Sequence, residues 1–232
     1  MNACWLLKPD AAGGNQTAND LLFIGGRPRL PAELELPVCR LCGAPLTFFF
    51  QTAFPERHAW QSHSIAVFAC SSCADERYLI PEMLGGTLAG ADIPEGFLTD
   101  YERNFRIIPF RTQDGIPRAD YEPKITFVRL LALPAPKPNA KGSKMGGSPN
   151  WLLDDETPAS YASSVPMTFL MQLTDPIRFE LEDDAPPQTR IGLRGKPEPS
   201  RHRYYELFLG NRIYLFGTAA GSEPLVYALT QV

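Results

Sequence analysis

The sequence of 232 residues has little excess charge, few histidines and no long apolar run. It carries 22 Lys and Arg against 26 Asp and Glu, a formal net charge of −4, so it lacks the basic excess typical of proteins that bind nucleic acid or anionic membranes. No window approaches the ~18 consecutive apolar residues of a membrane helix. The first ten residues show neither the basic start nor the apolar stretch of a signal peptide. We therefore expect a cytoplasmic protein.

Common catalytic motifs are also missing. The chain contains no Gly-x-Ser-x-Gly elbow and no His-Glu-x-x-His helix, and its glycine-rich stretch Gly85–Gly90 lacks the lysine of a phosphate-binding loop. Only three histidines occur, which limits general-base chemistry near neutral pH. The sequence therefore predicts a protein that is not an enzyme.

Proline, in contrast, is abundant, and it indicates the fold class. The 23 prolines are roughly twice the usual ~5% of residues, which disfavours long helices and favours short strands joined by ordered loops. We expect a mainly β fold, α+β at most, with a short helix around Pro81–Leu84. The expected strands are Leu46–Gln51, Ser64–Ala69, Arg212–Gly217 and a hairpin of Tyr204–Leu209 with Arg212–Phe216, turned at Gly210-Asn211.

An internal repeat predicts two similar antiparallel β halves. Phe23–Gln51 and Lys144–Gln172 align without a gap and share nine of 29 positions, where roughly two would match by chance. We interpret this as an internal duplication that gives two pseudo-equivalent halves. The expected division is a zinc-containing half (1–133), a proline-rich linker (134–143) and a metal-free half (144–232), which either stay separate or pack as one unit.

Each repeat contains a Gly-Gly-x-Pro turn followed by an apolar strand that ends in glutamine. The glycines allow positive φ angles in a tight turn. Gln51 and Gln172 have two interpretations: buried amides that satisfy the backbone of the turn, or polar groups that recognise a ligand.

Four cysteines give the strongest chemical signal. Cys39 and Cys42 form one Cys-x-x-Cys pair, and Cys70 and Cys73 form a second. Two such pairs can place four thiolates around one zinc ion at ~2.3 Å, as a pair of zinc knuckles. Two disulfides or a redox pair are the alternatives. The remaining Cys4 is expected to be a free thiol.

The same pattern predicts the number and the role of the metal. Under the repeat, Cys39 and Cys42 align with Ser160 and Ser163, so one zinc per chain is expected, in the first half only. Four thiolates leave no open coordination position, which is typical of a structural site. The two histidines between the cysteine pairs, His58 and His63, are either substitute ligands or surface and second-layer groups. The charges of this region balance, which disfavours nucleic acid as its partner.

Two resemblances follow from these motifs. Lys144–Leu152, the strand that ends at Gln172 and the segment Asn211–Phe216 resemble the bacterial YwqG-like family of unknown function. Pro37–Gln51 followed by Val67–Cys70 is similar to the zinc segment of the programmed cell death protein two family. That second resemblance implies a dedicated chaperone for a small-subunit ribosomal protein.

The sequence therefore predicts a non-enzymatic, zinc-stabilised protein-interaction module, an escort or chaperone for one client protein. The expected partner surface is a groove between the halves, with Trp151 as an aromatic anchor, Asp154 and Asp155 attracting a basic client, and Gln172 beside them. Two alternatives remain open: an immunity-type binding partner of a toxin, and an enzyme of unrecognised class that uses the cleft between the halves.

Overall fold

The computed structural model describes residues 3–174, 178–219 and 224–232, and in this part of the chain the fold is mainly β, as predicted. The helical elements are short: α1 (Phe97–Asp100) and the 3-10 turns η1 (Glu76–Tyr78), η2 (Thr112–Asp114) and η3 (Phe208–Gly210). The strands are β1 (Cys4–Pro9), β2 (Leu22–Ile24), β3 (Arg29–Leu30), β4 (Thr47–Ala53), β5 (His63–Ala69), β6 (Asp92–Ile93), β7 (Phe105–Arg111), β8 (Ile116–Pro117), β9 (Val128–Pro134), β10 (Lys144–Gly146), β11 (Ser160–Tyr161), β12 (Val165–Leu173), β13 (Phe179–Glu180), β14 (Thr189–Ile191), β15 (Pro197–Pro199), β16 (Tyr204–Tyr205), β17 (Arg212–Thr218) and β18 (Val226–Gln231).

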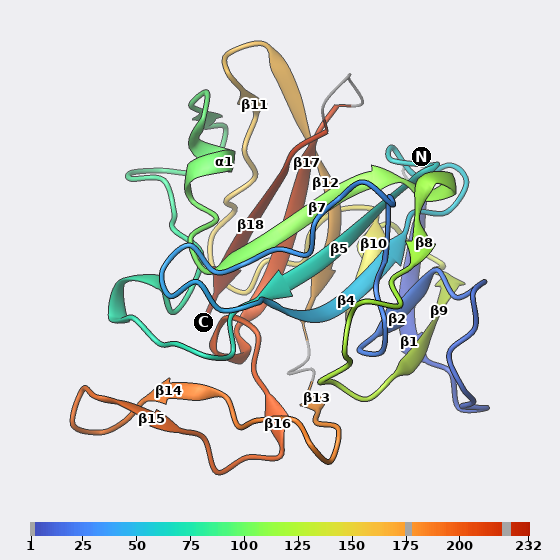
Figure 1. The fold of residues 1–232 in the computed structure, drawn as a ribbon. Coiled ribbons are helices and arrows are strands. Elements are labelled where there is room, and N and C mark those ends of the chain that lie inside the picture. The colour runs from blue at the N-terminus through green and yellow to red at the C-terminus, as the bar shows by residue number, and fades with distance from the viewer. Residues whose placement is uncertain (1–2, 175–177, 220–223) are drawn as a thin grey trace.

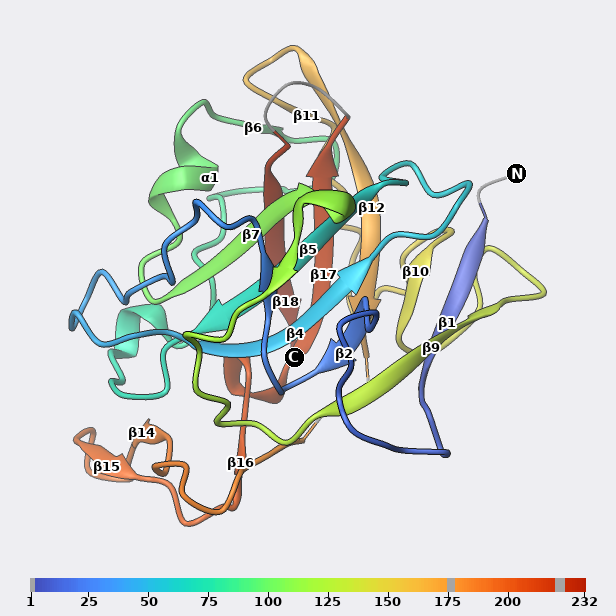
Figure 2. The same cartoon turned by 45° about the vertical axis from the view of Figure 1, so that its right-hand side comes forward.

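One large sheet runs through most of these strands. Its order is β18-β17-β12-β10-β1-β9-β2-β4-β5-β7, and β11 and β6 extend it beside β12. The sheet folds back on itself, so that β5 and β7 lie across β17 and β18 (Figures 1 and 2). We call β2, β4, β5 and β7 the first limb, and β10, β12, β17 and β18 the second limb.

The main hydrophobic core lies between the two limbs. It contains Val67 and Ile107 from the first limb together with Leu215 and Tyr227 from the second, all at most 4% exposed. Polar contacts join the limbs as well: the Trp60 indole N–H, in the loop after β4, donates to the carbonyl oxygen of Thr218 at 2.9 Å. The core therefore depends on the limbs crossing at this position.

A second, smaller core covers the outer face of the first limb. Phe48 and Phe68 point away from the main core and pack with Leu30, which precedes the cysteine region, and with Cys39 and Cys70 themselves. As a result β4 and β5 are buried on both faces, which explains why their sequences are apolar runs rather than alternating patterns.

The sequence repeat coincides with a repeated hydrogen-bond pattern. Phe23 pairs with Gln51 between β2 and β4, and Lys144 pairs with Gln172 between β10 and β12. The strand register also shifts at matching places, directly after Phe48 in β4 and directly after Phe169 in β12. Counted from opposite ends of the sheet, β2 and β10 hold the same place, as do β4 and β12. Descent of both halves from one duplicated unit stays a prediction.

The strand β1 lies where the two parts of the sheet meet. It pairs with β10 on one side and with β9 on the other, so the strands of the ranges 1–133 and 144–232 join at the centre of one continuous sheet. The proline-rich segment between them packs against the second Gly-Gly turn, where Ser148 N–H donates to the carbonyl oxygen of Pro138 at 3.0 Å. None of the helices in the described ranges combines the length and apolar character needed to cross a membrane.

Two local predictions are wrong. The expected hairpin around Gly210-Asn211 does not form, because β16 pairs with β13 and β17 pairs with β12 and β18. The side chains of Leu207 and Phe208 are buried in the core, and the chain between β16 and β17 forms η3 there instead of a hairpin turn. No helix forms over Pro81–Leu84. Two glycines follow that segment directly, and glycine is unfavourable in helices.

The contact between the limbs predicts the effect of a small substitution. In Gly217→Ala the new Cβ would clash with Cζ2 of Trp60, so we expect a loss of about 1–3 kcal/mol in the free energy of unfolding through overpacking. Urea denaturation followed by fluorescence measures this. Gly85→Ala is the control, because no atom lies within 4 Å of its Cβ position; equal stability of the two variants would contradict the described crossing.

Candidate metal centre

The first cysteine pair sits in a tight turn stabilised by its own backbone. The Cys39 N–H donates to the carbonyl oxygen of Ala44, and the Gly43 N–H donates to that of Cys39, both at 2.8 Å. Gly43 has a φ of +74°, a left-handed conformation that favours glycine. Arg40, inside the turn, donates its N–H to the carbonyl oxygen of Arg103 at 2.9 Å, which fixes the turn against the segment after α1.

The second cysteine pair follows directly from the end of β5. The Cys70 N–H donates to the carbonyl oxygen of Asn104 at 2.7 Å. The hydroxyl of Ser71 lies 2.7 Å from that of Thr47 at the start of β4. Because β4 and β5 are hydrogen-bonded neighbours, the start of one and the end of the other bring the two turns together.

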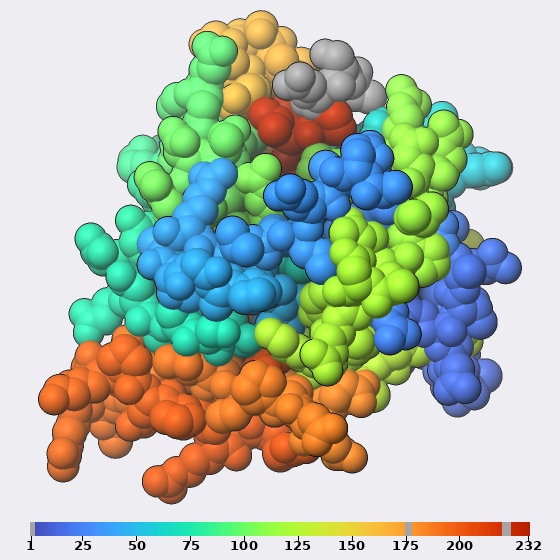
Figure 3. All heavy atoms as spheres, in the orientation of Figure 1, coloured from blue at the N-terminus to red at the C-terminus, as the bar shows by residue number. Residues whose placement is uncertain are grey.

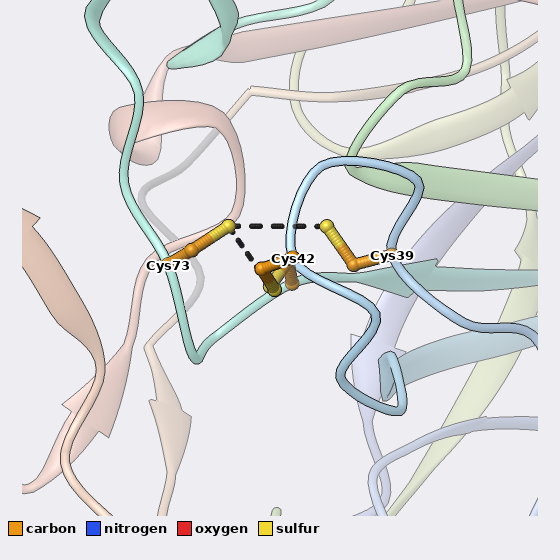
Figure 4. Close-up of side chains that lie close together, drawn as sticks. Cys39, Cys42 and Cys73 are labelled. Atoms are coloured by element: carbon orange, nitrogen blue, oxygen red, sulfur yellow. Dashed lines mark hydrogen bonds between the residues drawn. The ribbon is translucent and has the colours of Figure 1, made fainter.

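The four sulfur atoms form one compact group. The Sγ–Sγ distances are 3.8 Å for Cys39–Cys73, 3.8 Å for Cys42–Cys70 and 3.5 Å for Cys70–Cys73, and all four atoms lie within 4.8 Å of one another. Figure 4 shows the sulfur atoms of Cys39 and Cys73 directed towards each other, with Cys42 beside them. Sulfur atoms at tetrahedral corners ~2.3 Å from one ion would be ~3.8 Å apart. The predicted residues therefore form a site that fits a metal ion.

The same distances bear on the disulfide alternative. All five cysteines are free, and the sulfur separations are far longer than the ~2.05 Å of a disulfide bond. Cys4, in β1, is buried and also free, as predicted.

Burial changes the acidity of the thiols. It raises the pKa of Cys70 to about 11. Cys42 is largely exposed, and the partial loss of water around its thiol acts to raise the pKa. Hydrogen bonds from the Ala44 N–H and with the three neighbouring thiols outweigh this effect and lower the pKa below its usual value. A bound cation would deprotonate all four groups, so metal binding at this site must release protons.

Neither histidine between the cysteine pairs lies near the thiols. His63 begins β5, at the end opposite to Cys70. His58 is buried: its Nδ1 accepts from Trp60 N–H at 3.0 Å, and its Nε2–H donates to the carbonyl oxygen of Leu170 at 3.1 Å. The expectation of a surface or second-layer role for His58 is therefore wrong, because this ring bridges the two limbs.

The two glutamines of the repeat occupy matching positions inside the fold. Gln51 Oε1 accepts from Arg29 N–H, and Gln172 Oε1 accepts from Asn150 N–H, both at 2.8 Å. Gln172 also donates to the carbonyl oxygen of Gly142 at 2.9 Å. Both side chains are 0% exposed. Gln172, expected beside the partner surface, thus uses its amide to hold the turn that precedes Trp151.

The other expected partner residues lie in a loop on the outer face of the second limb. Trp151 is half-buried, with its ring centroid 4.4 Å from that of Tyr214. Asp154 and Asp155 are exposed. A residue that no sequence motif marks, Gln231, holds this loop. Its Oε1 accepts from two backbone N–H groups of the loop, and its Nε2 donates to the Asp154 carbonyl oxygen and a Glu156 carboxylate oxygen. Nothing in the sequence links Gln231 to this loop.

A small hollow does lie between residues of the two halves. It has a volume of about 130 Å³ and is bordered by Arg57 and His58 on one side and by Gly146, Gly147 and Thr168 on the other. Trp151 and the aspartates of its loop are not part of the wall. The described hollow and the loop are therefore separate surfaces.

No protein-family model matches the chain, and no curated protein is similar to it in sequence. The two family resemblances therefore stay predictions, and the proposed function rests on the geometry of the site.

Removing one thiol tests the metal centre. We expect Cys42→Ser to lose the bound metal and to lower the melting temperature markedly, because apparent binding energies of structural zinc, on the order of 10–16 kcal/mol, exceed the net stability of most domains. Elemental analysis and calorimetry give the two readouts. Cys4→Ser, which removes a cysteine outside the cluster, should keep the metal; equal metal content in both variants would refute the site.

The buried imidazole of His58 predicts a dependence of stability on pH. Burial lowers its pKa to about 4, whereas an unfolded histidine titrates near ~6.5. Below pH ~6.5 the unfolded chain therefore binds more protons at this histidine than the folded chain does. The free energy of unfolding should fall as the pH drops from about 6.5 to about 4, by roughly 2 kcal/mol at pH 5. Urea denaturation at a series of pH values, compared with His58→Gln, measures it; an unchanged slope in the variant would exclude His58.

Proposed function

We propose that this chain is a zinc-stabilised, non-enzymatic protein-interaction module that escorts one client protein. The observation that carries the proposal is the group of four sulfur atoms, all within 4.8 Å of one another. A set made only of thiolates favours zinc among the common metals of proteins. Four sulfur ligands also complete a tetrahedral coordination sphere and leave no place for a reacting water or substrate.

The metal would act by fastening the outer layer of the first limb. Cys39 and Cys70 belong to the smaller core, together with Phe48 and Phe68. The loop that contributes Cys39 has little regular structure of its own. A metal bond to the end of β5 would hold that loop over the core, a contribution to folding rather than to catalysis.

The loop after Trp151 supports a protein client. Leu152 and Leu153 are 40% and 64% exposed, and the two exposed aspartates follow them directly. The hydrogen bonds from Gln231 hold the backbone of this loop in one conformation. An ordered loop with apolar and acidic side chains loses little entropy on binding and complements a basic client.

The two alternatives make different demands on the same molecule. An immunity-type partner of a toxin would use the same loop, so only the identity of the bound protein separates it from an escort. An enzyme would use the hollow beside His58, but both ring nitrogens of that histidine are engaged in hydrogen bonds and its pKa of about 4 makes it a weak base near neutral pH.

Affinity capture with the intact chain tests the proposal. We expect one stoichiometric client from extract of the source cells, and we expect Asp154→Lys/Asp155→Lys to weaken its binding about tenfold through lost charge attraction, measured by titration with the purified client. Glu33→Lys/Glu35→Lys, which makes the same charge change at exposed positions elsewhere, is the control. No stoichiometric client, or equal affinity of both variants, would count against the proposal.

A further inference from the structure

A basic arm stands out on an otherwise acidic molecule. The arm, residues 188–203, contains the hairpin of β14 and β15 and carries one acidic side chain, Glu198, and five basic ones: Arg190, Arg194, Lys196, Arg201 and Arg203. The whole chain has 22 basic and 26 acidic groups, so the remainder has 17 basic and 25 acidic. A local charge of +4 is therefore attached to a body of −8.

Most of this charge is free to meet a partner. Arg190 pairs with Glu206 at 3.3 Å, and Arg203 makes an exposed pair with Asp183 at 3.5 Å. The side chains of Arg194, Lys196 and Arg201 are exposed and form no ion pair within the described ranges. Leu193, at the tip, is fully exposed.

The arm is fastened to the metal centre. Thr189 N–H donates to the carbonyl oxygen of Ser71 at 2.9 Å, and its hydroxyl donates to that of Ser72 at 3.2 Å. Ser71 and Ser72 are the two residues between Cys70 and Cys73. Figure 3 shows the arm as part of the orange shelf that lies directly beneath the segment after β5. The turn that supplies two thiols thus also sets the direction of the arm.

A hollow lies where the arm meets the metal centre. It has a volume of about 110 Å³, and its walls include the apolar side chains of Leu79, Ile191 and Phe208 as well as Cys73. Engineered cavities of ~150 Å³ take up a benzene molecule. The hollow also has polar residues in its wall, among them Asn104 and Gln188; its size and its apolar part fit one apolar side chain of a partner.

The outer edge of the arm cannot extend the hairpin by strand pairing. Gly192 N–H donates to the carbonyl oxygen of Lys196, and Ser200 N–H donates to that of Gln188, so the residues whose nitrogen points outward on β15 are Pro197 and Pro199. Proline has no N–H to donate. Recognition along this edge must therefore come from side chains, and two cationic ones, Lys196 and Arg201, flank β15.

We propose that the arm is a second docking surface, which binds an acidic protein segment whose apolar side chain enters the hollow beside the metal centre. Arg194, Lys196 and Arg201 contact the carboxylates of that segment. The hydrogen bonds of Thr189 to the Cys70–Cys73 turn hold the arm in the orientation for binding. This surface is separate from the loop at Asp154 and Asp155, and it goes beyond the proposed function.

The surroundings of the arm favour an acidic protein over nucleic acid. The acidic body would repel a long phosphate backbone, whose charge extends beyond the arm, and nucleic acid has no aliphatic side chain to fill the hollow beside Leu79 and Ile191. Nucleic acid also stacks on open aromatic rings. The Tyr204 ring at the base of the arm already packs on Arg178 and His202, at 5.2 and 4.8 Å.

Fluorescence anisotropy with the intact chain tests the docking surface. The probes are a labelled glutamate-rich peptide with one central leucine, and labelled oligothymidylate. We expect Arg194→Glu/Lys196→Glu/Arg201→Glu to weaken peptide binding at least about tenfold, since three exposed attractions become repulsions. Lys8→Glu/Lys137→Glu/Lys141→Glu, with the same charge change at exposed sites, should leave it unchanged. No peptide binding by the native chain, equal loss in both variants, or tighter binding of oligothymidylate would overturn the proposal.

Thr189→Val tests the role of the metal-site turn, because it removes the hydroxyl bond to Ser72 and keeps the shape of the side chain. We expect several-fold weaker peptide binding with retained metal, and faster hydrogen exchange at residues 190–200 than in the native chain. Unchanged exchange and affinity would refute the positioning of the arm. If the arm variant and the native chain capture the same client equally well, the proposed function is supported and the arm is not its docking surface. If peptide binding depends on the arm but no client is captured, the docking surface is supported and the proposed function is not.

Discussion

Burial of β4, β5, β17 and β18 on both faces is the constraint on which the rest of this structure depends. The crossing of the limbs covers one face of each, through contacts as close as that between Gly217 and the Trp60 ring. The outer faces of these four strands must be covered as well, and the part of the chain that the structure describes contains no long helix that could cover them. Loops provide the cover, and loops need fastening because they lack an internal ladder of hydrogen bonds.

The two limbs fasten their covering loops in different ways. In the first limb, the loop from Gly25 to Leu46 carries two of the four thiols, and a metal ion there would fix it to the end of β5. In the second limb, Trp151 packs on Tyr214 and Phe216, and Gln231 binds the backbone of the following residues. Leu30, which aligns with Trp151 in the repeat, is fully buried beneath the first loop. One architecture is thus completed by thiols on one side and by aromatic and amide groups on the other.

The contacts that hold these loops in place also determine which surfaces are ordered enough to bind a partner. The loop at Asp154 is held by Gln231, and the basic arm is held by the turn between Cys70 and Cys73 through Thr189. Each presents charge of one sign from a fixed backbone, which lowers the entropy cost of association. The proposed recognition would therefore depend on residues that also stabilise the fold, and weakening one of these contacts should affect both.

The sequence by itself determined the features that depend on local spacing. The two Cys-x-x-Cys pairs identified the four thiols, the proline content indicated a mainly β fold, and the repeat located the matching turns and strands, because each of these signals lies within a short stretch of chain. Only the tertiary structure decided the rest. That β16 pairs with β13, that His58 bridges the limbs, and that Thr189 and Gln231 hold distant turns are results of long-range packing. Such contacts join residues tens to more than a hundred positions apart, and no periodicity encodes them, because they arise only where the folded sheet brings its two limbs together.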